Sequence, residues 1–158
     1  MRKQIMHEGM RKSVLTENQV WLDLNRLARV ELTSESAEHP IESALLIGKG
    51  NGWRAQHSGK QTIRLLFDNP HKISRIQLLF EEKEQERTQE FVLSWSANTE
   101  ATQLEIVRQQ YNFSPPDNTR ELEDYTVELN GLTMLELSIN PNISGGETRA
   151  SLAQLRLA

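Results

Sequence analysis

The sequence contains no cysteine, and this absence removes several kinds of chemistry at once. Without a thiol, the chain has no disulfide, no zinc–thiolate centre and no cysteine nucleophile. Small secreted β domains often depend on disulfides, so their absence is more typical of a reducing compartment. The basic residues that follow Met1 are also not succeeded by the apolar run of about 7–15 residues found in a secretory signal. Both absences predict a cytoplasmic protein.

Long apolar runs are absent as well, and so are the common catalytic motifs. No stretch approaches the ~18 consecutive apolar residues of a membrane-spanning helix, so we expect no membrane insertion. The sequence has no phosphate-binding loop, no dinucleotide-binding glycine pattern and no G-x-S-x-G nucleophile motif. The glycine-rich stretch 48–52 has no strand before it and no long helix after it, which favours a flexible turn.

Metal ions and nucleic acid are not expected as partners either. The four histidines, His7, His39, His57 and His71, do not occur at metal-ligand spacing, so we predict no metal and no cofactor. The formal net charge is −4, whereas a domain that binds duplex DNA normally carries a basic face. The composition therefore disfavours nucleic acid as a ligand.

Carboxylates cluster between residues 81 and 90, where Glu81, Glu82, Glu84 and Glu86 occur. A glycosidase needs two carboxylates that face each other across a gap of about 5–10 Å. Neighbours within one charged loop rarely meet this requirement, so the stretch indicates an exposed hairpin connection. Hydrolysis of a glycoside by Glu81 and another carboxylate is a minor alternative. The main expectation is that the chain is not an enzyme.

Apolar and polar residues alternate along most of the chain after residue 27. Ile63, Leu65 and Phe67 fall on one face of a predicted strand, and Phe91 and Leu93 do the same further along. Alternation of this kind indicates one buried and one solvated face, which is typical of antiparallel sheets packed face to face. Helix-length patterns between the strands are missing, which argues against a parallel α/β sheet.

The pattern predicts an all-β fold, namely an antiparallel two-sheet jelly-roll β-sandwich of about eight strands. Asp68-Asn69-Pro70 is expected to form a turn between two of these strands. The sandwich is assigned to residues 28–158, with a short helix expected at 40–46 inside it.

Residues 1–27 have a different character and are assigned to a separate segment. Thr16 and Gln19 resemble a capping box, and Val20, Leu24 and Leu27 follow at helical spacing. We expect a basic tail followed by a short N-terminal helix or irregular segment.

Several short motifs occur in a defined order along residues 28–158. They are Ser34-Glu35, His39-Pro40, Ala44-Leu45, Trp53-Arg54, the strand pattern 61–67 and the strand pattern 73–78. This ordered set resembles the discoidin or coagulation-factor type C group of the galactose-binding-like jelly rolls. The resemblance implies a fold whose ligands bind at loop tips or on a sheet face, and intracellular relatives use it to contact protein or damaged DNA. Many members hold calcium through an Asp after the Ala-Leu turn, but residues 46–50 contain no Asp, so we expect no calcium site.

Six residues are candidates for ligand binding: Trp53, Arg54, His57, Glu81, Arg87 and Gln89. A Trp ring can stack on a sugar, and a guanidinium group can make two parallel hydrogen bonds to one acceptor group. The last three candidates lie near one sheet end if the strands that flank them pair as a hairpin. The alternatives are that Trp53 packs under its loop, that Arg54 pairs with a loop carboxylate, and that residues 81–89 are a solvated hairpin.

The leading hypothesis is therefore a non-catalytic binding module for carbohydrate or a similar polyol. The alternative is a cytoplasmic protein–protein interaction scaffold with the same jelly-roll fold, for which the partner is another protein.

Overall fold

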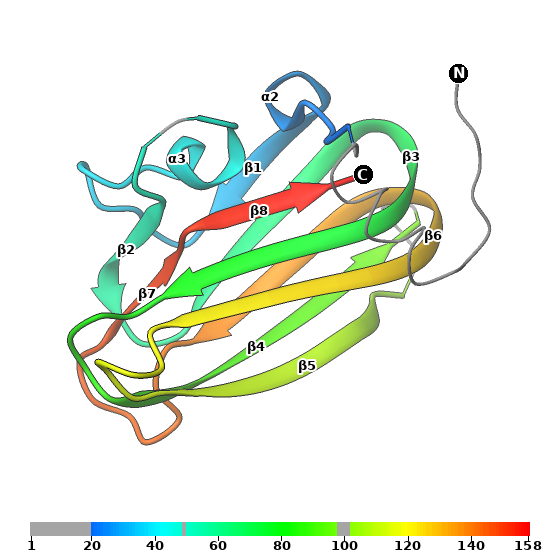
Figure 1. Cartoon of the computed structure of the whole chain (residues 1–158). Coiled ribbons are helices and arrows are strands. Elements are labelled where there is room, and N and C mark those ends of the chain that lie inside the picture. Colours follow the sequence, from blue (N-terminus) through cyan, green and yellow to red (C-terminus); the bar gives the residue numbers. More distant parts are fainter. Residues whose placement is uncertain (1–19, 49, 98–101) are drawn as a thin grey trace, which may run out of the picture.

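The computed structural model describes residues 20–48, 50–97 and 102–158. Within these ranges the elements are α2 (Leu24–Leu27), β1 (Ala28–Leu32), α3 (Glu42–Leu45), β2 (Trp53–Ser58), β3 (Gln61–Glu81), β4 (Arg87–Ser96), β5 (Leu104–Phe113), β6 (Arg120–Asn140), β7 (Arg149–Leu152) and β8 (Gln154–Leu157). The predicted all-β jelly roll of about eight strands is confirmed (Figure 1). The basic tail and the capping box at Thr16 lie outside the described residues, and the division at residue 28 stays a prediction.

The two longest strands, β3 and β6, each run through both layers of the sandwich. They pair antiparallel from Gln61 opposite Ile139 to Glu81 opposite Arg120. Register shifts between residues 66 and 75 of β3 mark the place where both strands bend over (Figure 1). The turn expected at residues 68–70 is therefore wrong, because these residues lie inside β3. Bulged pairing bends and twists a strand without ending it.

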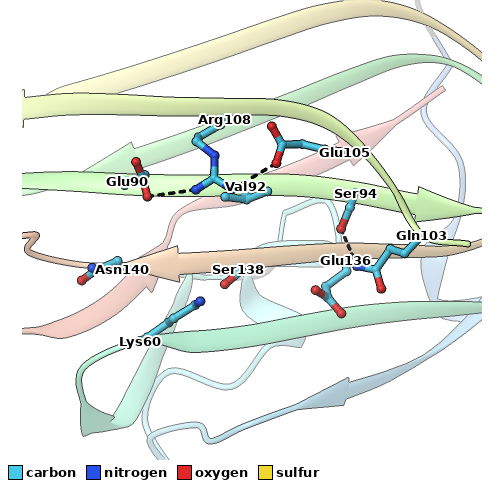
Figure 2. A pocket seen from close by; sticks show the side chains of 10 residues that line it. All are labelled: Lys60, Glu90, Val92, Ser94, Gln103, Glu105, Arg108, Glu136, Ser138 and Asn140. Carbon is cyan, nitrogen blue, oxygen red and sulfur yellow. Dashed lines mark hydrogen bonds and ion pairs between the residues drawn. The ribbon is translucent and has the colours of Figure 1, made fainter.

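One layer contains β1, the first half of β3, the second half of β6, β4 and β5, in the order β1-β3-β6-β4-β5. The other layer contains β8 and the remaining halves of β3 and β6. The β2–β7 pair forms a separate two-stranded sheet at the end of the sandwich far from the C-terminus (Figure 1). The first layer presents mainly polar side chains on its outer face (Figure 2).

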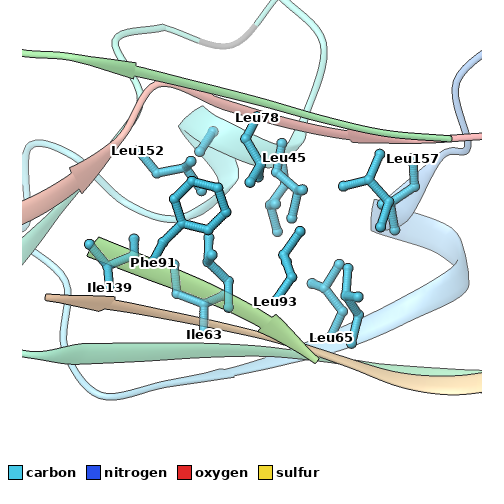
Figure 3. Packing of buried hydrophobic residues seen from close by; sticks show 14 of the residues in the cluster. Leu45, Ile63, Leu65, Leu78, Phe91, Leu93, Ile139, Leu152 and Leu157 are labelled. Carbon is cyan, nitrogen blue, oxygen red and sulfur yellow. The ribbon is translucent and has the colours of Figure 1, made fainter. Parts of the chain in front are cut away.

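The core lies between the two layers and is filled by aliphatic and aromatic side chains (Figure 3). Ile63 and Leu93 come from the first layer, Leu78 and Leu157 come from the second, and all four are at most 1% exposed. The Phe80 and Phe91 rings stack across the gap with their centroids 5.3 Å apart. Burial of this apolar surface is the main favourable term that holds the layers together.

The approach of β2 to β7 depends on a glycine. Gly52 has φ of +85°, and a Cβ at this position would lie 2.7 Å from the carbonyl oxygen of Leu152. Only glycine accepts both this backbone conformation and this close contact. The residues that follow, Trp53 and Arg54, are thereby placed opposite Leu152 and Ser151 of β7.

Candidate functional site

A groove opens at the end of the sandwich formed by β2, β7 and the connection from β3 to β4. It consists of two adjoining hollows of about 230 and 370 Å³. Four residues line both hollows and therefore make them one site, which we call the end groove: Arg54, Glu82, Glu84 and Arg149. His39, Asn51 and Glu81 line the first hollow only.

The wall of the end groove is shaped by the carboxylate of Glu82. It accepts hydrogen bonds from the backbone N–H groups of Glu84 and Gln85, at 3.0 and 3.2 Å, and from Nε of Arg87 at 2.7 Å. Burial alone would raise the pKa of Glu82, but these hydrogen bonds and the Arg87 charge hold it below its ordinary value. Thr148 Oγ1 donates to Gln85 Oε1 at 3.2 Å and ties this wall to the loop before β7. The groove is therefore braced from two sides.

Two arginines reach into the end groove from neighbouring strands. Arg54 belongs to β2 and Arg149 to β7, and both residues are exposed. Within the described parts of the chain, neither guanidinium group makes a hydrogen bond or an ion pair. Exposed carboxylates of Glu84 and Glu147 line the same groove and are equally without a side-chain partner there. The groove thus offers free donors and free acceptors side by side.

Trp53, the first predicted ligand residue, has another role in the structure. It borders the end groove but is only 1% exposed, and its Nε1 donates to the carbonyl oxygen of Ser34 at 3.0 Å. A ring that is covered to this extent has no free face for a sugar to stack on. The prediction that Trp53 stacks on a sugar is therefore wrong. Trp53 is a core residue, as in the alternative that it packs under its loop.

The other predicted residues are divided between the groove and the interior. Arg54 and Glu81 line the end groove, whereas His57 is exposed on β2 and does not line it. Arg87 and Gln89 are 3% and 0% exposed, so they do not form the solvated hairpin that was the alternative. The hairpin premise is wrong, because β4 pairs with β5 and β6 and the 82–86 connection crosses between layers.

A chain of buried polar groups continues from the groove wall into the core. Nη1 of Arg87 donates to Gln89 Oε1 at 3.3 Å and to the carbonyl oxygen of Pro141 at 2.7 Å. The guanidinium group also lies over the Phe113 ring, 4.8 Å from its centroid. Gln89 Nε2 in turn donates to Glu121 Oε1 at 3.2 Å. Arg87 is therefore the central donor that links the groove to the interior.

Glu121 ends this chain and is 1% exposed, with no hydrogen bond to its Oε2. Burial, together with the neighbouring Glu123 carboxylate, raises the pKa of Glu121 to about 9. Glu121 is consequently protonated at neutral pH, which lowers the cost of burying a carboxyl group whose Oε2 has no hydrogen-bond partner.

We expect the Glu121→Gln variant to gain stability relative to the parent protein as the pH rises. The folded protein keeps a proton on Glu121 that the unfolded chain releases above about 4.5, so this residue's contribution to stability is lost as pH rises toward about 9. The slope is at most about 1.4 kcal/mol per pH unit. Urea unfolding at about pH 5 and about pH 8 measures the effect. Glu105→Gln, at an exposed carboxylate, is the control. If the stability difference between Glu121→Gln and the parent protein is the same at both pH values, the raised pKa of Glu121 is contradicted.

No family model and no curated protein matches the sequence. Solved structures do match. The family 32 carbohydrate-binding module of AlyQ, in complex with 4,5-unsaturated mannuronic acid, has a TM-score of 0.62 and 15% identity over 89% of this chain and 98% of its own. The family 32 module of NanJ from Clostridium perfringens, in complex with galactose, has a TM-score of 0.61 and 13% identity over 87% and 96%. A pectin-binding module gives 0.58 and 17% over 84% and 90%.

The chain has the galactose-binding-like jelly-roll fold. The resemblance inferred from the ordered motifs is confirmed at this level, since identities of 13–17% establish the fold alone. Among its described residues, no helix of this jelly roll is long and apolar enough to cross a membrane. The same residues contain no group of three or more His, Asp or Glu side chains arranged to hold a metal ion.

Sequence reasoning missed several residues of the end groove, above all Arg149. Arg149, Ala150, Ser151 and Leu152 alternate between exposed and buried positions, so the outward direction of Arg149 could be predicted. The pairing of β7 with β2 could not be predicted, because about ninety residues separate the two strands in sequence. Glu82 was not predicted as a residue of the groove, because the whole acidic stretch 81–90 was interpreted as solvent-exposed.

Proposed function

We propose that the chain is a non-catalytic carbohydrate-binding module that holds a sugar in the end groove. The observation that carries the proposal is the set of unpaired arginine donors beside unpaired carboxylate acceptors in one hollow. A sugar hydroxyl both donates and accepts hydrogen bonds, so a polyol can use both kinds of group at once. The similar structures, several of them carbohydrate-binding modules with bound sugars, support this class of ligand. The cytoplasmic location inferred from the sequence stays a prediction.

Charge in the end groove favours a neutral sugar over an acidic one. The cations are Arg54, Lys83 and Arg149, and the carboxylates not neutralised by Arg87 are Glu81, Glu84 and Glu147. Opposite charges in equal number leave little net attraction for an anionic ligand. Because the Trp53 ring is covered, the sugar is held by hydrogen bonds without aromatic stacking, and a dissociation constant of about 1 mM is expected.

Replacing the two groove arginines tests the proposal. A hydrogen bond to a charged group contributes about 1.5–3 kcal/mol, so Arg54→Ala and Arg149→Ala should each weaken sugar binding about 10- to 150-fold. Titration of galactose and of N-acetylgalactosaminyl-β-1,3-galactose, followed by amide chemical shifts, measures the change. Arg29→Ala on β1, at another exposed arginine, is the matched control. Unchanged binding by the Arg54→Ala, Arg149→Ala double variant would exclude this groove as the sugar site.

One observation favours the second candidate, a protein-interaction scaffold. A hollow of about 310 Å³ lies along β1, which is the edge strand of its layer, and its lining includes the apolar residues Val30, Leu32 and Ile41. An edge strand with an apolar border suits the addition of a partner strand. Photocrosslinking from position 42, on the rim of this hollow, tests the idea against position 126 as control. Protein adducts specific to position 42 support it, and equal labelling at both positions contradicts it.

A further inference from the structure

The outer face of the first layer carries a further hollow, of about 360 Å³ (Figure 2). Three small side chains lie on its floor, Val92 and Ser94 of β4 and Ser138 of β6, with Ser138 opposite Val92. Glu136, opposite Ser94, is a longer side chain on the same strand as Ser138. Longer side chains rise on both sides, with Lys60 next to β3 and Arg108 on β5 (Figure 2). We call this hollow the trough. It shares no lining residue with the end groove.

The charged walls of the trough are internally paired. Arg108 donates to Glu90 at 3.3 Å and to Glu105 at 3.1 Å, and both bonds are drawn in Figure 2. On the other side, Nε of Arg64 donates to Glu136 at 2.7 Å. The lining itself carries three carboxylates, Glu90, Glu105 and Glu136, and two cations, Lys60 and Arg108. Arg64, outside the lining, partly offsets the excess carboxylate because it pairs with Glu136 as well as with Glu31, so the trough has a small net negative charge.

The floor of the trough offers hydrogen-bonding groups that suit hydroxyls. Ser138, Asn140 and Lys60 line the trough (Figure 2), and in the described residues none of these three side chains is held by an ion pair. Asn140 Oδ1 accepts from the backbone N–H of Asn142 at 3.3 Å, which leaves its amide N–H groups to donate. Ser94 accepts from the Gln103 amide and keeps its own O–H free to donate.

We propose that the trough is a second binding site, and that it takes a neutral oligosaccharide lying parallel to the strands. The outward-facing positions 136, 138 and 140 of β6 lie along the length of the trough. They span ~13 Å of strand, which is longer than one sugar ring. The backbones of β6 and β4 beneath the floor are paired on both sides, so no free edge is available to a peptide strand. The slight excess of carboxylates favours a neutral chain over a polyanion.

Chemical-shift mapping of the backbone amides tests this site with defined probes. The probes are β-1,4-galactotetraose, cellotetraose and tetragalacturonate, each at about 10 mM, which is ten times a dissociation constant of 1 mM. We expect at least one neutral tetrasaccharide to shift the amides of residues 92, 94 and 136–140, with a smaller effect from tetragalacturonate. Ser138→Leu, which fills the floor, should weaken this binding at least about tenfold, and Lys60→Ala should weaken it less.

Two control variants separate this site from the rest of the protein. Thr126→Leu places the same side chain on the outer face of the other layer and should leave the trough shifts unchanged. Arg54→Ala should also leave them unchanged, because the end groove is a different place.

Three results would overturn the trough as a site for neutral glycans. The first is shifts confined to residues 54, 82–86 and 149, which would support the end groove alone. The second is trough shifts that persist in Ser138→Leu, and the third is trough shifts with tetragalacturonate only. Trough shifts without any shift at the end groove would instead uphold the trough and count against the proposed function.

Discussion

Arg87→Met is expected to destabilise the protein by about 3–5 kcal/mol, the cost of removing one partner from a buried charged network. The Arg87 side chain is 1% exposed and serves Glu82, Gln89 and the carbonyl oxygen of Pro141. Met has a similar length and fills the space, so the loss comes from the polar groups left without a donor. Urea unfolding monitored by fluorescence measures the free energy.

The matched control is Arg108→Met on the outer sheet face. Arg108 also pairs with two carboxylates, Glu90 and Glu105, but its side chain is 54% exposed. Water replaces a lost partner at such a site, so the expected cost is about 0–1 kcal/mol. If the two variants are equally stable, burial is not what makes the Arg87 network strong, and its assignment as the central donor fails.

The same replacement should also disturb the end groove. Glu82 belongs to both the end groove and the buried polar network, since it lines the groove and accepts a hydrogen bond from Nε of Arg87. Without Arg87, the Glu82 carboxylate loses the cation that lowers its pKa and the hydrogen bond that links the 82–86 connection to β4. The shape of the groove is therefore coupled to a polar chain that reaches Glu121 in the core.

Most of the strands could be predicted because alternation directly reports a face buried against a core. Ile63, Leu65 and Phe67 were placed correctly on one buried face. The continuity of β3 was not predictable in this way, since residues 68–70 have the composition of a turn. Whether such a segment ends a strand or lies in its bulged bend depends on pairing with β6, about sixty residues away.

The interior position of the polar network could have been recognised from the same alternation. Arg87 and Gln89 continue the period of Phe91 and Leu93, so a strand that starts at Arg87 places all four side chains on the inner face. Charge led to the opposite interpretation, that residues 81–89 are solvated. Composition alone misleads here because a buried Arg is acceptable when every N–H group that it buries finds a partner.

Trp53→Ala should lower stability by about 3–5 kcal/mol, as is usual for removal of a buried aromatic ring, and the melting temperature by about 6–20 °C. Trp53→Phe keeps most of the packing and loses mainly the Nε1 bond to Ser34, so a cost of about 1–3 kcal/mol is expected. This second variant separates a core role from a ligand role. With the ring 1% exposed, Trp53→Phe should bind galactose within about twofold of the parent protein. A tenfold loss of binding in folded Trp53→Phe would mean that sugar reaches the ring, which requires the end groove to open further than its walls at Glu82 and Arg149 now allow.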